Sequence, residues 1–166
     1  MRVPIRKAGK FTYIKPDPYI TQAKFDEFTA NLKKLKENVQ PRLIKEVKTL
    51  ALMGDFSENA AYQIAKGKLR GVNQKILELE KQVLGAKIIK TNKNTGTVKI
   101  GHLVTVKLNN KQQKFRILGS SETNPTTGVI SHKSPLGLAL LNKKIEDIVE
   151  VKLKDKIVNY KIIKIE

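Results

Sequence analysis

Two carboxylates three residues apart, Asp55 and Glu58, stand in a short segment that interrupts the long helical pattern of this chain. Magnesium in proteins prefers one or two carboxylates, keeps several waters and completes its octahedron with substrate phosphate. Two acids alone should therefore bind the ion weakly. Beside a second ion and a phosphate, the same pair could hold it for phosphodiester hydrolysis. Asn59 and Ser57 could orient the attacking water by hydrogen bonds.

An alternative role for the same two acids is helix capping. Asp55 followed three residues later by Glu58 resembles a capping box, in which each side chain satisfies an amide of the first helical turn. Either acid would also suit the positive end of a helix dipole. One side chain could serve both roles if it exchanged partners on docking.

The residues on either side of this segment predict two long helices, because apolar residues recur at the three- and four-residue spacings of a coiled-coil seam. Helix one should run from a cap at Thr21 to about residue 53 with a kink at Pro41, and helix two over about 57–86. Two such stripes can bury themselves only against each other, so we expect an antiparallel finger with Asp55 and Glu58 at its tip. The seam comprises Phe25, Phe28, Leu32, Leu35 and Val39, then Leu43, Val47 and Leu50 in a shifted phase, then Tyr62, Ala65, Leu69, Val72, Ile76, Leu79, Val83 and Ala86.

Basic residues concentrate behind the expected tip. They recur at three- or four-residue spacings, so each set should form a surface stripe on its helix. In an antiparallel hairpin the two stripes should approach one another, and a patch roughly 15–20 Å from the tip could hold nucleic acid by its phosphates. The alternative is a generic solvated face of a lysine-rich protein. The stripes are Arg42, Lys45 and Lys48 on helix one and Lys66 and Arg70 on helix two.

The composition limits the classes of function. Lys and Arg number 33 against 15 acids, and the resulting charge of +18 favours polyanions such as nucleic acid or an anionic membrane surface. No apolar run approaches the roughly 18 residues that span a bilayer, and the basic start lacks the apolar core of a signal peptide. We therefore expect a cytoplasmic protein with no membrane partner.

The composition also excludes thiol chemistry. The absence of cysteine rules out disulfides, thiolate metal sites and a cysteine nucleophile. His102 and His132 have no second ligand at a metal-site spacing, so we expect them to be sheet or loop residues.

The second half of the chain predicts a small sheet, because the apolar period changes from 3.6 to 2 after a polar linker. A short helix should begin after Ser134, with Pro135 and Leu136 in its first turn, and reach about Leu141. The sequence thus predicts an α+β protein with a basic extended lead-in (1–20), a finger (21–89), a linker (90–101) and a mostly antiparallel domain (102–166). The expected strands are 102–108, 112–118, 128–131, 148–153 and 157–165, with a hairpin turn at Asn109-Asn110-Lys111.

Three blocks of this sequence resemble the bacterial Gre transcript cleavage factors. Gly54-Asp55-Phe56-Ser57-Glu58-Asn59-Ala60-Ala61-Tyr62 is similar to the family's tip pattern Gly-Asp-x-x-Glu-Asn-Ala-acidic-Tyr. Phe115-Arg116-Ile117-Leu118-Gly119 resembles its Tyr/Phe-Arg-Ile-Val-Gly strand, and residues 130–141 resemble its Ile-Ser-x-x-Ser-Pro-x-x-x-x-Leu block. The blocks occur in the family's order over residues 21–166. One departure is Ala61, which replaces the acidic residue usual before the tyrosine, and residues 1–20 have no counterpart.

The resemblance implies an FKBP-like second domain and a function in transcription. The domain would dock on RNA polymerase through Ser134, Pro135 and Leu136, and the finger would enter the secondary channel, where the nascent RNA 3′ end of a backtracked complex is extruded. Asp55 and Glu58 would be the catalytic, metal-holding pair, sharing Mg²⁺ with the polymerase active site and binding none tightly alone. The factor, expected to be a monomer, would be no enzyme itself but would stimulate the polymerase's own RNA cleavage.

Two other functions stay open at this point. A paralogue of the same fold could occupy the channel as an inhibitor or competitor without stimulating cleavage; Ala61 leaves room for this, whereas Asp55 and Glu58 favour cleavage. A basic nucleic-acid-binding coiled coil unrelated to polymerase would leave the Ser134-Pro135 block unexplained. Prolyl isomerisation is disfavoured, because the second domain is poor in the aromatic residues that line an FKBP-type pocket.

Overall fold

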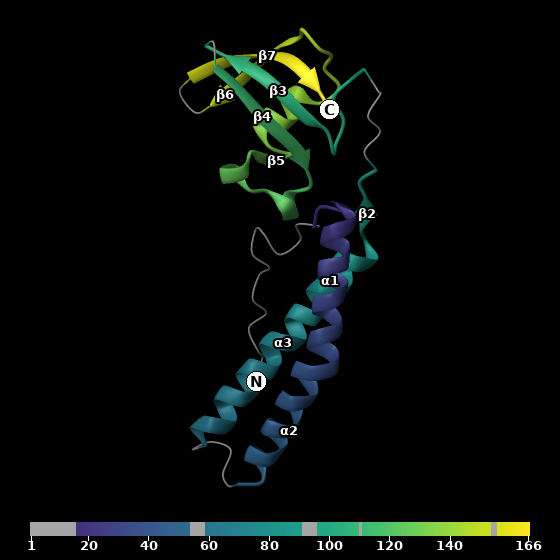
Figure 1. The fold of residues 1–166 in the computed structure, drawn as a ribbon. Helices are drawn as coiled ribbons and strands as arrows, with labels where there is room; N and C mark the ends of the chain where they lie inside the picture. Colours follow the sequence, from purple (N-terminus) through teal and green to yellow (C-terminus); the bar gives the residue numbers. More distant parts are fainter. Residues whose placement is uncertain (1–15, 54–58, 91–95, 110, 154–155) are drawn as a thin grey trace, which may run out of the picture.

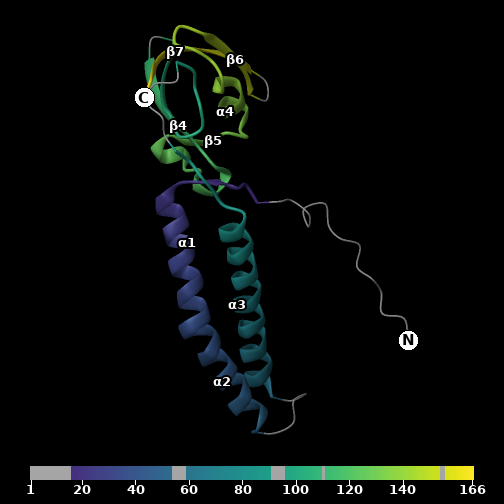
Figure 2. The ribbon, with the colours of Figure 1, turned by 90° about the vertical axis from the view of Figure 1, so that its right-hand side faces the viewer.

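A helical finger projects from a small sheet domain (Figure 1) in the computed structural model, which describes residues 16–53, 59–90, 96–109, 111–153 and 156–166. One arm of the finger consists of α1 (Gln22–Lys34), a π-helical turn (Leu35–Val39) and α2 (Gln40–Ala51). The other arm is α3 (Ala60–Leu84). Figure 2 shows the two arms side by side along the length of the finger, which confirms the predicted antiparallel hairpin. No described helix is long and apolar enough to cross a membrane.

The first arm begins and bends close to where the sequence predicts. The Thr21 hydroxyl accepts a hydrogen bond from the Lys24 amide at 3.3 Å, which is the predicted cap. The predicted kink at Pro41 is a π-helical turn just before it, closed by a bond from the Gln40 amide to the Leu35 carbonyl. Because a π turn holds one extra residue, it rotates everything after it relative to what precedes it. This accounts for the shifted phase of the apolar stripe.

The sheet domain confirms a mostly antiparallel arrangement with one short helix. Its strands are β3 (Leu103–Leu108), β4 (Lys111–Leu118), β5 (Val129–Ser131), β6 (Ile148–Leu153) and β7 (Lys156–Ile165). They are ordered β5-β4-β3-β7-β6, and within this sheet the β4–β5 pair is parallel whereas the other pairs are antiparallel. The helix α4 (Pro135–Leu140) begins as predicted at Ser134, whose hydroxyl accepts from the Gly137 amide at 3.1 Å.

The described end of the predicted linker belongs to the sheet domain. Val98 is fully buried in the core, its amide donates to the Lys143 carbonyl at 2.8 Å, and its carbonyl accepts from the Asn142 amide at 2.9 Å. A single valine among polar residues gives no period, so the sequence did not reveal this contact. Other buried members of the core are Val104, Val106, Ile117, Leu140, Val149, Val151, Tyr160 and Ile162.

The described end of the predicted lead-in is also folded, and it joins the finger to the sheet domain. β1 (Tyr19–Ile20) pairs in parallel with β2 (Lys87–Ile88), the segment that leaves α3. The chain passes so close to Gly119 that a Cβ there would lie 1.8 Å from the Tyr19 carbonyl oxygen. A side chain at this position would force the two segments apart.

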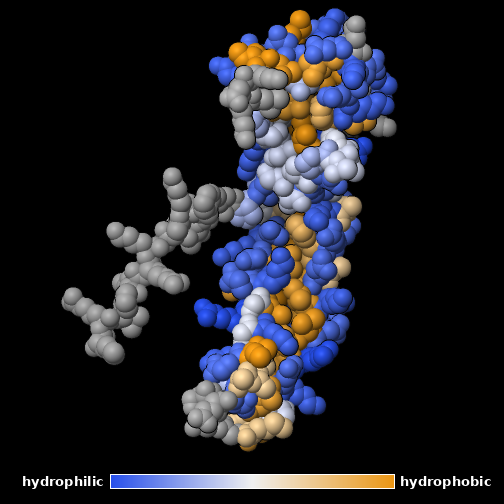
Figure 3. Space-filling view, turned by 90° about the vertical axis from the view of Figure 1, so that its left-hand side faces the viewer, coloured by the Kyte–Doolittle hydropathy of each residue, from blue (hydrophilic) through white to orange (hydrophobic). Residues whose placement is uncertain are grey.

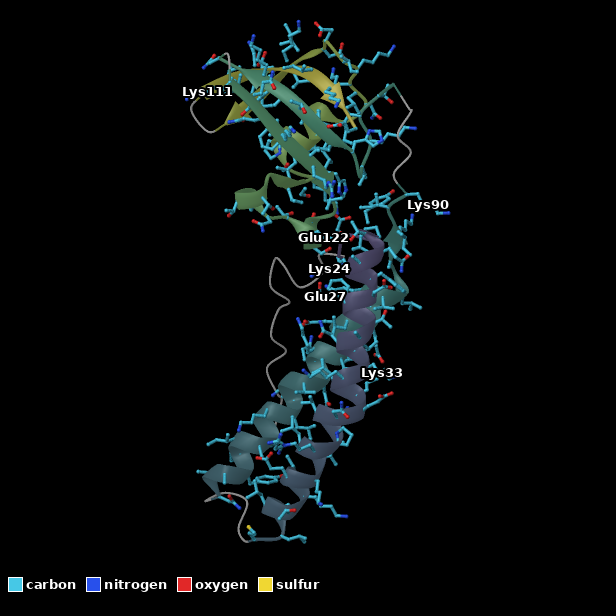
Figure 4. All side chains as sticks on the ribbon, in the orientation of Figure 1. Lys24, Glu27, Lys33, Lys90, Lys111 and Glu122 are labelled. Atoms are coloured by element: carbon cyan, nitrogen blue, oxygen red, sulfur yellow. The ribbon has the colours of Figure 1, made fainter. Side chains whose placement is uncertain are left out.

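Charged and polar groups complete this joint. The Asp17 carboxylate, 3% exposed, accepts from the amide of Ser120 at 2.9 Å and from its hydroxyl at 2.8 Å, and lies 3.3 Å from His132 Nδ1. At the start of α1, the amide and hydroxyl of Thr21 donate to the two carboxylate oxygens of Glu122 at 2.8 and 2.5 Å. Figure 4 shows Glu122 beside Lys24, at the end of the finger nearest the sheet domain.

The Asp17 carboxylate should make folding sensitive to acid. Burial raises its pKa, but hydrogen bonds from Ser120 and Tyr19 and the charge of His132 outweigh burial, so the pKa lies below its ordinary value. A folded-state pKa below the unfolded one stabilises the fold above about pH 4, and this contribution disappears as pH falls through the lower folded value.

We predict that Asp17→Asn lowers the free energy of unfolding at pH 7 by about 1–3 kcal/mol, because it weakens hydrogen bonds to a buried charge. Urea unfolding at pH 7 and pH 3 measures the effect, and the deficit should shrink at pH 3. Asp26→Asn, which alters an exposed carboxylate on α1, is the matched control. An equal deficit at both pH values would contradict the assignment.

Candidate functional site

The acidic pair stands between two helix ends that the structure describes. Asp55, Glu58 and Ser57 themselves lie outside the described residues. The first arm ends at Ala51 with its cap at Leu52, and α3 begins at Ala60. The sequence therefore assigns the two acids to the connection at the end of the finger farthest from the sheet domain (Figure 2).

Asn59 fastens the two arms together at this end. Its side-chain oxygen accepts from the Tyr62 amide at 2.9 Å, and its side-chain nitrogen donates to the Leu50 carbonyl at 3.0 Å. One amide thus caps the start of α3 and satisfies a carbonyl in the last turn of α2. If Asn59 also orients a water, it must use its second amide hydrogen or its remaining lone pair.

The capping interpretation of the acidic pair is wrong for α3. Asn59 holds the cap position, so a capping box built on Asp55 and Glu58 would begin the helix four residues too early. Asp55 and Glu58 themselves lie outside the described residues, so a role beside the positive end of the helix dipole and the metal-holding role both stay predictions.

A groove between α2 and α3 lies directly behind Asn59. Its volume is about 590 Å³, and its basic residues are Arg42 and Lys45 on one arm and Lys68 on the other. Ala61 and Ile64 lie in its wall, and Ile64 is 59% exposed. The remaining lining residues are Glu46, Thr49 and Leu50. The groove combines exposed cations with an apolar floor, which suits a phosphate-bearing chain with stackable bases.

The other predicted basic residues lie outside this groove. Lys66 and Arg70 are exposed on α3, and helical periodicity aligns them with Asn73, which accepts a hydrogen bond from Gln40 at 2.9 Å. Lys48 is exposed on α2 but does not line the groove. The five predicted residues therefore form two groups, and Lys68 rather than Lys66 or Arg70 faces Arg42 and Lys45.

The end of the finger also exposes apolar surface. Leu52 is 82% exposed and Met53 is 71% exposed, next to the acidic connection. Large exposed apolar residues beside charged ones commonly mark a surface that a partner covers. Among the described residues, no cluster of three or more histidine, aspartate or glutamate side chains could hold a metal.

Comparison with known families covers both parts of this chain. Residues 18–88 match the family model described as "Transcription elongation factor, N-terminal", and residues 92–166 match "Transcription elongation factor, GreA/GreB, C-term". The chain belongs to the GreA/GreB family of transcription elongation factors. The N-terminal match starts at residue 18, so most of the predicted lead-in lies outside the GreA/GreB family models.

Individual relatives agree with this assignment. The chain is 39% identical over 137 residues to transcription elongation factor GreA of Mycoplasma capricolum, an alignment that covers 80% of this chain and 87% of that protein. It is 35% identical over 149 residues to GreA of Clostridioides difficile, covering 88% and 94% of the two chains.

Among solved structures, the chain is similar to GreA factor homolog 1 of Thermus thermophilus, at 20% identity and a TM-score of 0.40 over 89% of this chain and 97% of that one. A GreA/GreB factor from Nitrosomonas europaea gives 17% identity and a TM-score of 0.40 over 54% and 78%.

The block predicted to bind polymerase is partly occupied in building the sheet domain of this GreA/GreB family member. The Ser134 hydroxyl donates to the Ser131 carbonyl at 2.7 Å besides capping α4, and Leu136 packs against the core. Pro135 is exposed, and so is Leu138, which is 61% exposed on the same helix. Polymerase binding by this block stays a prediction, and Pro135 and Leu138 are the side chains free to make it.

The role of Asn59 can be separated into its two hydrogen bonds. We predict that Asn59→Ala lowers the free energy of unfolding by about 1–2 kcal/mol, because both bonds are lost. Asn59→Asp should cost less, since it keeps the capping oxygen and loses the donor to Leu50. Urea unfolding measures both, with Gln74→Ala as a control for losing an exposed amide that bonds only within α3. If Asn59→Ala is no more harmful than Gln74→Ala, Asn59 does not fasten the arms.

Proposed function

We propose that this protein inserts its finger into the secondary channel of RNA polymerase and stimulates the polymerase to cleave backtracked nascent RNA. Membership of the GreA/GreB family supports the coarse assignment to transcription elongation. The observation that supports the proposed cleavage mechanism is the acidic pair, Asp55 and Glu58, in the connection between α2 and α3. The factor would act as a cytoplasmic monomer and would be no enzyme by itself.

Residues at different positions along the finger would have different roles in cleavage. Asp55 and Glu58 would hold a magnesium ion jointly with the polymerase, a donor set that fits the preference of magnesium for few carboxylates. When bound, such an ion stabilises charge and activates water in phosphodiester hydrolysis. Leu52 and Met53, exposed beside the pair, would be covered by the walls of the channel.

The groove behind the tip would hold the extruded RNA. Arg42, Lys45 and Lys68 present their charges along one side of the hairpin, and Ile64 supplies an apolar surface among them. At 1.5 Å per residue, Arg42 lies about 14 Å along the helix from the end of α2 at Ala51. RNA must therefore extend well past the acidic pair before it reaches the far end of the groove.

The acidic pair is tested by a cleavage assay on a stalled, backtracked elongation complex. We predict that Asp55→Ala and Glu58→Ala each reduce stimulated cleavage by orders of magnitude and leave polymerase affinity nearly unchanged. Glu37→Ala, an exposed acid elsewhere on the first arm, should retain full activity. Wild-type cleavage by both single variants would overturn the proposal. Slowed RNA synthesis without cleavage by the unmodified protein would support the inhibitor alternative.

The basic groove is tested by two matched triple variants. We predict that replacing Arg42, Lys45 and Lys68 with alanine weakens cleavage most on long backtracked 3′ segments and lowers its sensitivity to salt. The control removes the same charge from exposed positions outside the groove, at Lys48, Lys66 and Arg70, and should have a smaller effect. Equal losses in both variants would indicate a general charge effect instead of a binding groove.

A further inference from the structure

The base of the finger carries a groove that the described residues leave open. It has a volume of about 700 Å³ and lies between α1 and α3. Its apolar residues are Phe28, Leu35 and Val39 on the first arm and Leu79 on α3. Leu79 is 4% exposed, but α1 has no fully buried residue although three apolar side chains lie on its seam. Figure 3 shows apolar surface running along the finger between hydrophilic borders.

The chain enters the described structure at the mouth of this groove. Pro16 and Asp17 line an adjoining hollow of about 350 Å³, and this hollow shares Phe28, Gln82 and Ser121 with the groove. The Asp17 carboxylate is held by Ser120 and His132, so the point of entry is fixed. Whatever precedes residue 16 is therefore held at high effective concentration beside the groove.

The sequence just before this point has the composition of a buried segment. Residues 11–14, Phe-Thr-Tyr-Ile, are the longest uncharged run in residues 1–15, a stretch that otherwise carries five basic residues and no acid. The rim of the groove is itself basic, with Lys24, Lys34 and Lys75 against Glu27, and Lys24 already pairs with Glu27 at 2.8 Å. A basic segment would be repelled there, so the uncharged run is the part of the lead-in that fits.

The lengths agree. An extended chain advances at most about 3.6 Å per residue, so Phe11 can reach roughly 18 Å from Pro16. The groove floor from Phe28 to Val39 spans roughly 16 Å at 1.5 Å per helical residue. Residues 11–14 can thus lie along the groove from Phe28 toward Val39 without moving Asp17.

We propose that Phe11, Tyr13 and Ile14 pack into the groove between α1 and α3 and complete the half-buried seam of α1. The lead-in then forms a third element against the base of the finger and fastens it to the joint at Asp17. This inference does not depend on the proposed function, because the packing segment, residues 11–14, lies outside the family models.

Disulfide trapping tests the proposal cleanly, because the chain has no cysteine of its own. Thr12→Cys leaves the three apolar side chains intact, and Asn31→Cys places a partner in the groove. The matched control pairs Thr12→Cys with Lys33→Cys, which lies on α1 away from Lys24 and Glu27 (Figure 4). With oxidised glutathione, we expect the groove pair to form an intramolecular disulfide about tenfold faster than the control pair, a ratio that corresponds to about 1.4 kcal/mol in favour of docking.

Two other outcomes would overturn the proposal. Equal rates for the two pairs would mean that the lead-in does not prefer the groove. Disulfides between two chains in place of internal ones would make a second copy the occupant.

Hydrogen exchange provides an independent readout without cysteines. We expect Phe11→Ser with Tyr13→Ser to speed exchange of the α1 amides several-fold, because docking protects this helix from local opening. Val3→Ser with Ile5→Ser removes apolar groups from the basic part of the lead-in and should leave exchange unchanged. Unchanged exchange in both double variants would overturn the proposal.

Discussion

The finger depends on one continuous apolar contact between its two arms. Leu43 on one arm and Ala65, Ile76 and Leu79 on the other are the residues that this contact buries. Burying a leucine or isoleucine side chain contributes about 1.5–3 kcal/mol, whereas an exposed ion pair such as Lys36–Glu80 contributes about 1 kcal/mol or less. The polar pairs across the arms therefore adjust the register of a structure that apolar burial holds together, despite the high positive charge of the chain.

The joint sets the direction in which the finger points. Asp17 binds Ser120 and faces His132, and Thr21 binds Glu122, so both ends of the short segment before α1 are fixed to the sheet domain. These contacts differ in kind from the apolar seam, because they are directional and nearly all made by charged groups. A factor whose tip must reach a defined point needs such a joint, since a small rotation at the base displaces the tip by a much larger distance.

Local patterns in the sequence were sufficient to predict the helices and strands. They were insufficient to predict the contacts between these elements. The arms, the caps at Thr21 and Ser134 and the strands follow from periodicity and capping chemistry within a few residues. Asp17 is 103 residues from its partner Ser120, and no local pattern links them. The choice of Asn59 as the cap of α3 rests on its contact with the Leu50 carbonyl across the turn, which a capping pattern alone does not reveal.

The residues that line the basic groove were also only partly predicted from local patterns. Charge spacing selected Lys66 and Arg70, because each stripe was considered on its own helix. The position of Ala65 on the seam determines which lysines flank the contact with α2, and it places Lys68 on the side of Arg42 and Lys45. Combining the phase of the seam with the charges would have identified Lys68 from the sequence.

The parallel pairing of β1 with β2 gives the finger a mechanical property. The strand that leads into α1 and the strand that leaves α3 are bonded to each other, with the Lys87 amide donating to the Pro18 carbonyl at 2.6 Å and the Ile89 amide to the Ile20 carbonyl at 2.9 Å. One arm cannot slide along the other without breaking these bonds at the base, and Asn59 opposes the same motion at the far end. A force applied along the finger is therefore shared by both arms and reaches the sheet domain through the contacts of Asp17 and Thr21.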